Sequence, residues 1–208
     1  MKQAIILDPA HGKDTPGKRS PDGIHKEYFW SRERIANIVN NVLKSSCNCN
    51  LFYPFLYHMN EPGLINRVKK YNYIAKDFDE TLVISLHNDA ENPKNCDKDG
   101  WGKANGAAVW TSKGQDKSDI YATDWYNFMT SRYPNQHFRK QTWQDGDADY
   151  EADFTILAGN KNVKPNYNAI LIEWLFQTNK EDVSKLMNPI HNEYFEDMMT
   201  EWIINLKL

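Results

Sequence analysis

The chain has 208 residues and a mass of 24.3 kDa, the size of one domain that can bury a core without disulfide bonds. Apolar residues make up 40% of it and charged residues 25%, which excludes collagen-like, low-complexity and disordered proteins. The net charge of −3 argues against a nucleic-acid-binding protein, because gripping phosphates requires a basic surface.

No apolar stretch approaches the ~18 residues of a membrane-spanning helix, and the first residues lack the long apolar core of a signal peptide. The three cysteines include no C-x-x-C pair, so they match no thiolate zinc template and suit a reduced compartment. Without an internal repeat or a Gly/Ser linker, we expect one domain over residues 1–208.

Short aliphatic runs alternate with segments of helical period, which is typical of an α/β domain with a largely parallel sheet. Strands are predicted at residues 4–8, 51–57, 82–87, 107–111, 154–157 and 169–173. Pro54 makes the second of these an edge strand or a broken one. Apolar residues three and four positions apart predict amphipathic helices within residues 35–43, 64–78, 121–132 and 194–206.

Two long polar connections, residues 88–105 and 133–151, contain Trp101 and Trp143. Long loops in a compact domain are often functional, so these aromatic side chains could stack on a ligand. Alternatively, each Trp pins its loop to the body of the protein.

Polar residues suited to chemistry stand where three predicted strands end. His11 follows the first strand closely, His87 ends the third, and Glu173 ends the last. In open α/β sheets the ligand site lies outside the carboxyl ends of the strands, so these residues are expected to converge. Two His and a carboxylate are a common catalytic zinc set, and a spare carboxylate can act as general base.

Position alone does not select the remaining metal ligand. The candidates are Glu27, which lies at the entry to the first helix after a Gly/Pro-rich loop, His25 and His58. No H-E-x-x-H, P-loop, G-x-S-x-G or G-x-G-x-x-G motif offers a competing chemistry.

Four ordered elements between residues 4 and 188 resemble the zinc-dependent N-acetylmuramoyl-L-alanine amidases of the cell-separation and phage-endolysin type. D-P-A-H-G at residues 8–12 is similar to the family's D-P-G-H-G, and Glu27 falls where the family has its glutamate ligand. S-L-H-N-D-A at residues 85–90 resembles S-I-H-A-N-A, and I-E-W-L-F-Q-T-N at residues 172–179 resembles V-E-x-G-F-x-x-N.

The resemblance implies that His11, Glu27 and His87 bind one Zn²⁺ and that Glu173 is the catalytic base. The implied reaction is hydrolysis of the amide that joins the lactyl group of N-acetylmuramic acid to L-alanine in peptidoglycan. The implied fold is a single α/β domain, a twisted and mostly parallel sheet of about six strands with helices on both faces.

Other positions of the motifs carry secondary expectations. Asp8 is expected to fix the metal-binding tautomer of a ligand histidine, or else to serve as a turn residue before Pro9. Asp89 could compete for the metal. Leu175 stands where the family has a glycine, which permits backbone conformations that a side chain resists. Arg67 falls where the family carries an arginine, and either orients the site or is a surface charge.

The expected partner is peptidoglycan, bound by a monomer without nucleic acid, membrane span or separate wall-binding module. Lack of an export signal fits a phage endolysin made in the host cytoplasm and released to the wall, and equally a secreted domain whose signal has been removed. The alternatives are a zinc peptidase or aminoacylase acting on a non-wall amide, and a non-catalytic peptidoglycan-binding protein.

Overall fold

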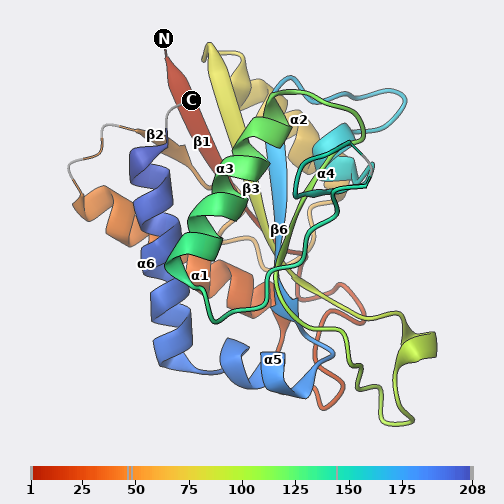
Figure 1. Cartoon of the computed structure of the whole chain (residues 1–208). Coiled ribbons are helices and arrows are strands. Elements are labelled where there is room, and N and C mark those ends of the chain that lie inside the picture. The colour runs from red at the N-terminus through yellow and green to blue at the C-terminus, as the bar shows by residue number, and fades with distance from the viewer. Residues whose placement is uncertain (1, 46, 48, 144, 207–208) are drawn as a thin grey trace.

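A computed structural model describes residues 2–45, 47, 49–143 and 145–206 of the chain. Its centre is a six-stranded sheet with the strand order β2-β1-β3-β6-β4-β5 (Figure 1). The strands are β1 (Gln3–Pro9), β2 (Asn50–Phe52), β3 (Glu80–Asp89), β4 (Ala108–Thr111), β5 (Tyr150–Glu151) and β6 (Asn168–Phe176). All neighbouring strands pair in parallel except β4 and β6, which confirms the predicted mostly parallel sheet.

Helices cover both faces of the sheet, as expected (Figure 1). They are α1 (Glu27–Lys44), α2 (Leu64–Ala75), α3 (Lys117–Arg132), α4 (Thr155–Ala158), α5 (Lys180–Leu186) and α6 (Pro189–Asn205). Alternate strand residues point to opposite faces: Ile5 packs with α1, α3 and α6, whereas Ile6 packs with α2 and α4. None of the helices described has the length and apolar character needed to cross a membrane.

The predicted strand at residues 154–157 is wrong, because this segment forms the single turn of α4. The backbone N–H groups of Leu157 and Ala158 both donate to the carbonyl of Phe154. The consecutive residues Ile156 and Leu157 are therefore buried in the same core, which a strand would not allow. A four-residue apolar run does not distinguish a buried strand from a helical turn.

The second predicted strand, residues 51–57, is shorter than expected. Pairing with β1 stops at Phe52, and the chain turns where the N–H of Leu56 donates to the carbonyl of Tyr53. Pro54 lies inside this turn, and β2 is an edge strand, as its proline predicted.

The buried carboxylate of Asp8 joins β1 to α2 and β3. Its Oδ1 accepts hydrogen bonds from Arg67 Nη1, at 2.5 Å, and from the Tyr71 hydroxyl, while its Oδ2 accepts from Ser85 Oγ at 2.5 Å. Burial alone would raise the pKa of Asp8, but the Arg67 charge and the two hydroxyls hold it below its usual value. Arg67 is thus a buried partner of Asp8, and the expectation of a surface charge is wrong.

Leu175 in β6 is fully buried yet has φ of +67°, the left-handed region in which glycine is favoured. It lies beside the register shift of the β3–β6 pair, which falls between His87 and Asp89. The side chain therefore gains packing in the core at a backbone conformation that costs about 1–2 kcal/mol.

We expect Arg67→Met to destabilise the fold by about 3–5 kcal/mol, because it leaves the Asp8 carboxylate buried without its cation. Urea unfolding at neutral pH measures this, with the exposed Lys69→Met on the same helix as a control expected within about 0.5 kcal/mol of the parent. Since the folded-state pKa of Asp8 is lowered, its stabilisation is present above the unfolded pKa and is lost as the pH falls toward the folded value. The difference in the free energy of unfolding between Arg67→Met and the parent should therefore become smaller in acid. A cost no larger than that of the control would contradict the role given to this ion pair.

At position 175 we expect Gly to be better tolerated than Ala. Both substitutions empty the same buried space, but Leu175→Gly also relieves the left-handed strain, by about 1 kcal/mol. Leu186, buried in α5, is the matched control, and there Ala should be more stable than Gly by about 1 kcal/mol. If the Ala variant were more stable than the Gly variant at both positions in urea unfolding, the interpretation would be refuted.

Candidate metal and catalytic site

Three side chains from separate elements converge at the carboxyl ends of β1 and β3. Glu27 Oε1 lies 3.3 Å from His11 Nε2 and 3.0 Å from His87 Nδ1. One ligand atom from each of the three residues lies within 4.8 Å of the others. The two histidine rings meet edge to face, with their centroids 4.9 Å apart. The structure therefore brings together the set of residues that the motif resemblance selected.

His11 lies in a turn held by two arginines. Its φ is +44°, uncommon for a residue with a side chain. Arg32 Nη2 donates to the His11 carbonyl at 2.7 Å, and Arg67 Nη2 donates to it at 3.2 Å. After it, a Cβ at Gly12 would come within 2.0 Å of the Glu61 backbone nitrogen, so only glycine fits. These contacts fix the backbone conformation from which the His11 side chain extends.

Glu27 is fully buried, and its carboxylate has a partner on every side. Beyond the two histidines, Oε1 accepts from the backbone N–H of Asn88 at 3.2 Å and Oε2 accepts from Gln177 Nε2 at 2.9 Å. Burial would raise the pKa of Glu27, but the hydrogen bonds and charges of His11 and His87 hold it well below its usual value. As the first residue of α1, the carboxylate also faces the positive end of the helix dipole.

Asp8 acts on His87 through Ser85. The hydroxyl of Ser85 has one proton, which it donates to the ionised Asp8, so Ser85 Oγ must accept from His87 Nε2–H at 3.1 Å. The neutral ring therefore carries its proton on Nε2 and presents an unprotonated Nδ1 to Glu27. The expectation that Asp8 supports a ligand histidine agrees with this geometry, with Ser85 between the two.

This donor set fits a metal ion. His87 Nδ1 and Glu27 Oε1 are both acceptors, and at 3.0 Å they repel each other unless a cation or a proton lies between them. Two imidazole nitrogens and one carboxylate oxygen are ligands that zinc prefers, and three protein ligands leave a further position open to water.

Glu173 lines the same cavity as the histidines, and β3–β6 pairing places it beside His87. The cavity has a volume of about 330 Å³. Burial raises the pKa of Glu173 well above its usual value, and the negative charges of Asp89 and Glu27 raise it further. Among the described residues, none donates a hydrogen bond to Glu173 Oε2. The arrangement leaves a proton-accepting oxygen beside the candidate metal site.

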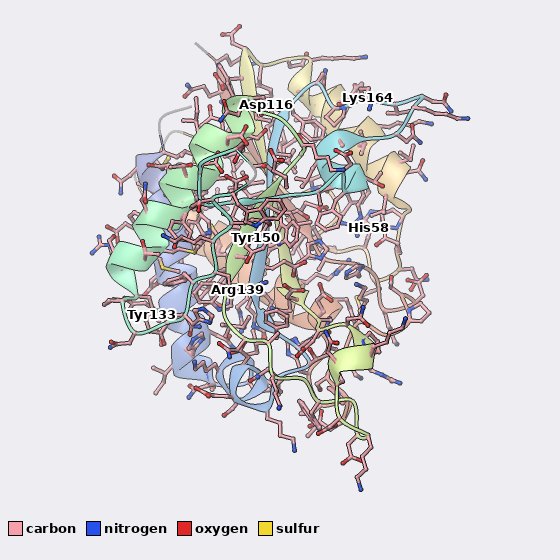
Figure 2. All side chains as sticks on the ribbon, turned by 45° about the vertical axis from the view of Figure 1, so that its right-hand side comes forward. His58, Asp116, Tyr133, Arg139, Tyr150 and Lys164 are labelled. Atoms are coloured by element: carbon pink, nitrogen blue, oxygen red, sulfur yellow. The ribbon has the colours of Figure 1, made fainter. Side chains whose placement is uncertain are left out.

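The rejected ligand candidates have other partners. His25 is buried, with Nε2 2.9 Å from Asn88 Oδ1, and His58 is exposed. Asp89 does not join the set, because Arg139 Nη2 donates to its Oδ2 at 2.6 Å. The Arg139 guanidinium lies over the ring of Tyr150, 5.5 Å from its centroid (Figure 2).

The two loop tryptophans lie elsewhere. Neither is among the residues found to line the Glu173 cavity, so stacking on a ligand there is not supported. Trp143 is 78% exposed, whereas Trp101 is half-buried with Lys180 Nζ 5.5 Å from its ring centroid.

Sequence reasoning missed Ser85 and Gln177. Ser85 had a usable signal, because it is two residues before His87 on the same strand and so points to the same face. Gln177 had none, since its contact with Glu27 joins residues 150 positions apart.

Comparisons with known proteins agree on one family. The family model of N-acetylmuramoyl-L-alanine amidase matches residues 5–205. No curated protein matches the chain by sequence.

Several solved structures share the fold. The N-acetylmuramoyl-L-alanine amidase of Clostridium difficile 630 has 20% identity and a TM-score of 0.73, with 97% of this chain and 95% of that chain covered. The catalytic domain of the amidase CwlV from Bacillus (Paenibacillus) polymyxa var. colistinus has 13% identity and a TM-score of 0.73, with 98% and 96% covered. Ami1 from Mycobacterium smegmatis has 14% identity and a TM-score of 0.73, with 97% and 94% covered. Because the family model spans nearly the whole chain, the chain belongs to the N-acetylmuramoyl-L-alanine amidase family.

Proposed function

We propose that the chain hydrolyses the amide bond of its peptidoglycan substrate with one zinc ion bound by His11, Glu27 and His87, and with Glu173 as general base. The chain is an amidase of its family, which acts on the bond between N-acetylmuramic acid and L-alanine in peptidoglycan. The observation that carries the proposal is the meeting of three ligand atoms within 4.8 Å, beside a cavity lined by Glu173.

Separate residues would hold the ion and orient one of its ligands. His11, Glu27 and His87 would hold the ion, and the Asp8–Ser85 pair keeps His87 in the tautomer whose Nδ1 can bind it. Bound zinc supplies Lewis-acid chemistry, polarising a carbonyl and lowering the pKa of water to ~7.

Glu173 moves the proton. Its carboxylate takes a proton from the attacking water and later gives it to the leaving amine of L-alanine, so the residue ends as it began. A raised pKa suits this task, because a base of ordinary pKa holds the proton too weakly at neutral pH to return it efficiently.

Glu173→Gln removes the base and keeps the shape of the side chain. We expect turnover on purified sacculi to fall by about three orders of magnitude while bound zinc stays at one per chain. Turnover is measured as new L-alanine amino termini on intact glycan strands, and zinc by elemental analysis. The exposed Glu193→Gln on α6 is the control and should keep full activity.

Unchanged turnover in Glu173→Gln would remove Glu173 from the mechanism. Sacculi that release no L-alanine termini with the parent protein, while small acylated amino acids are cleaved, would favour the non-wall amidase. Binding to sacculi without zinc or turnover would favour the non-catalytic protein.

His87→Ala should lower zinc affinity by at least about tenfold and abolish turnover, because it removes one of three protein ligands. His58→Ala is the matched control, since His58 was a candidate ligand from sequence and lies exposed outside the group. Zinc content after dialysis against a weak chelator measures the difference. Loss of zinc from His58→Ala but not from His87→Ala would overturn the ligand assignment.

A further inference from the structure

A second group of carboxylates lies outside the amidase site. We name it the acidic cluster, and its members are Asp119 of α3, Asp145, Asp147, Asp149 and Glu151. Ligand oxygens of Asp119, Asp145 and Glu151 lie within 4.8 Å of one another, and so do those of Asp119, Asp147 and Asp149. Asp119 belongs to both sets, so the two form one continuous group.

The acidic cluster is well separated from Glu173. Along β4, Ala108 is the register partner of Glu173, and Thr111, which contacts the cluster, is three residues further on. Three strand residues span about 10 Å. In Figure 2, Asp116 just before α3 and Tyr150 of β5 mark the two segments that carry the cluster.

Several carboxylate oxygens of the cluster are buried without a hydrogen-bond donor. Asp149 is fully buried, and its Oδ1 has no donor among the described residues. The same holds for both carboxylate oxygens of Asp145 and for Oδ1 of Asp147. An ionised carboxylate buried without a donor or a cation is strongly disfavoured.

The surrounding protein compensates only part of the cluster: Asp119 Oδ2 accepts from the Asp116 N–H at 2.5 Å, and Glu151 Oε1 accepts from the Gly114 N–H at 3.0 Å. Thr111 Oγ1 has one proton, but it contacts Asp149 Oδ2 and lies 3.3 Å from Asp119 Oδ1. Within the described part of the chain, no Lys or Arg forms an ion pair with any of the four aspartates. Burial and the neighbouring Asp147 carboxyl raise the pKa of Asp149 to about 8, as expected when carboxylates crowd without a cation.

The spacing of the cluster suits an ion with many oxygen ligands. In D-G-D-A-D-Y-E at residues 145–151, every second residue is acidic. Gly146, at φ of +108°, provides a bend between the first two aspartates. Residues 145–149 follow a series of bends, and only Tyr150 and Glu151 are extended, where the Tyr150 ring packs on Trp110 with centroids 4.8 Å apart.

We propose that the acidic cluster binds a calcium ion. Calcium takes six to eight oxygen ligands in flexible geometry, which three of these carboxylates together with backbone carbonyls and waters can supply, whereas magnesium is usually held by one or two carboxylates and keeps its water. Zinc favours nitrogen and sulfur, which the cluster lacks. A surface hollow lined by Asp119 and Asp147 gives the ion a path from solvent.

Such an ion would also fix one wall of the amidase cavity. The chain continues from Glu151 to Asp153, Phe154, Thr155 and Ile156, all of which line the cavity with Glu173. Holding residues 145–151 in place therefore limits the movement of this wall. The calcium proposal does not depend on the proposed zinc chemistry.

The test uses full-length protein that has been stripped with a chelator and resupplied with one equivalent of zinc. Adding calcium chloride to about a hundred times its Kd should raise Tm by about 5–10 °C, and magnesium chloride should have little effect. No shift in the parent up to about 10 mM calcium, roughly ten times the Kd of the weakest known sites, would overturn the proposal. An equal shift with magnesium would overturn the assignment to calcium.

Variants localise the effect. The double variant Asp147→Asn/Asp149→Asn should lose the calcium shift, yet without calcium its Tm should equal or exceed that of the parent, because repulsion is relieved. The exposed Asp77→Asn is the control and should keep the full shift. A calcium shift that persists in the double variant would place binding elsewhere and overturn the proposal.

A measurement on the parent protein covers the case in which the double variant fails to fold. Terbium bound at the cluster should luminesce on excitation of the adjacent Tyr150 and Trp110 rings, and calcium should displace it. Emission that is absent, or that calcium does not remove, would contradict the proposal.

Discussion

The buried carboxylate of Glu27 is the constraint around which the site is built. A charged group without solvent must be paired and hydrogen-bonded, or its burial opposes folding. Its partners come from the turn after β1, from β3 and from the segment after β6, namely His11, His87, Asn88 and Gln177. The chain can satisfy this one group only if the carboxyl ends of those strands meet, so the stability of the fold and the geometry of the site share the same contacts.

Asp8 is a second buried carboxylate whose partners come from separate elements of the fold. It is buried and paired with the Arg67 cation. Through Ser85 it is connected to His87 Nε2, the ring nitrogen that does not contact Glu27. His87 is thereby held between two acidic groups that act on different ring nitrogens. The arrangement explains why the sequence places an acidic residue near the carboxyl end of a buried strand, where an aliphatic residue would otherwise be expected.

The sequence predicted the layers of the fold well because burial leaves a periodic trace. Aliphatic runs at β1, β3 and β6 and the three- and four-residue spacing of the long helices reflect one-sided or two-sided burial. The run at residues 154–157 was misread because a single buried turn and a buried strand look alike over four residues. The short helix α5 was not predicted, since seven residues carry too little periodicity.

The site was predictable only in part. His11, His87 and Glu173 were predicted as site residues because each stands at or just after the end of a predicted strand. Parallel strands end at the same edge of a sheet, and the three residues meet there. The choice of Glu27 over His25 and His58 needed the family resemblance, because helix-start position and histidine identity carry no distance information. The Ser85 and Gln177 contacts depend on strand register and on pairings between residues far apart along the chain, which a local pattern does not encode.

Glu27 is the first residue of a helix and has hydrogen-bond donors that do not depend on a metal ion, which has a consequence for folding. A zinc finger collapses when its ion leaves because nothing else compensates its ligands. Here the carboxylate has the backbone N–H of Asn88, the amide of Gln177 and the helix N-terminus as partners, all of them present without an ion. The protein is thus suited to fold before any metal ion binds.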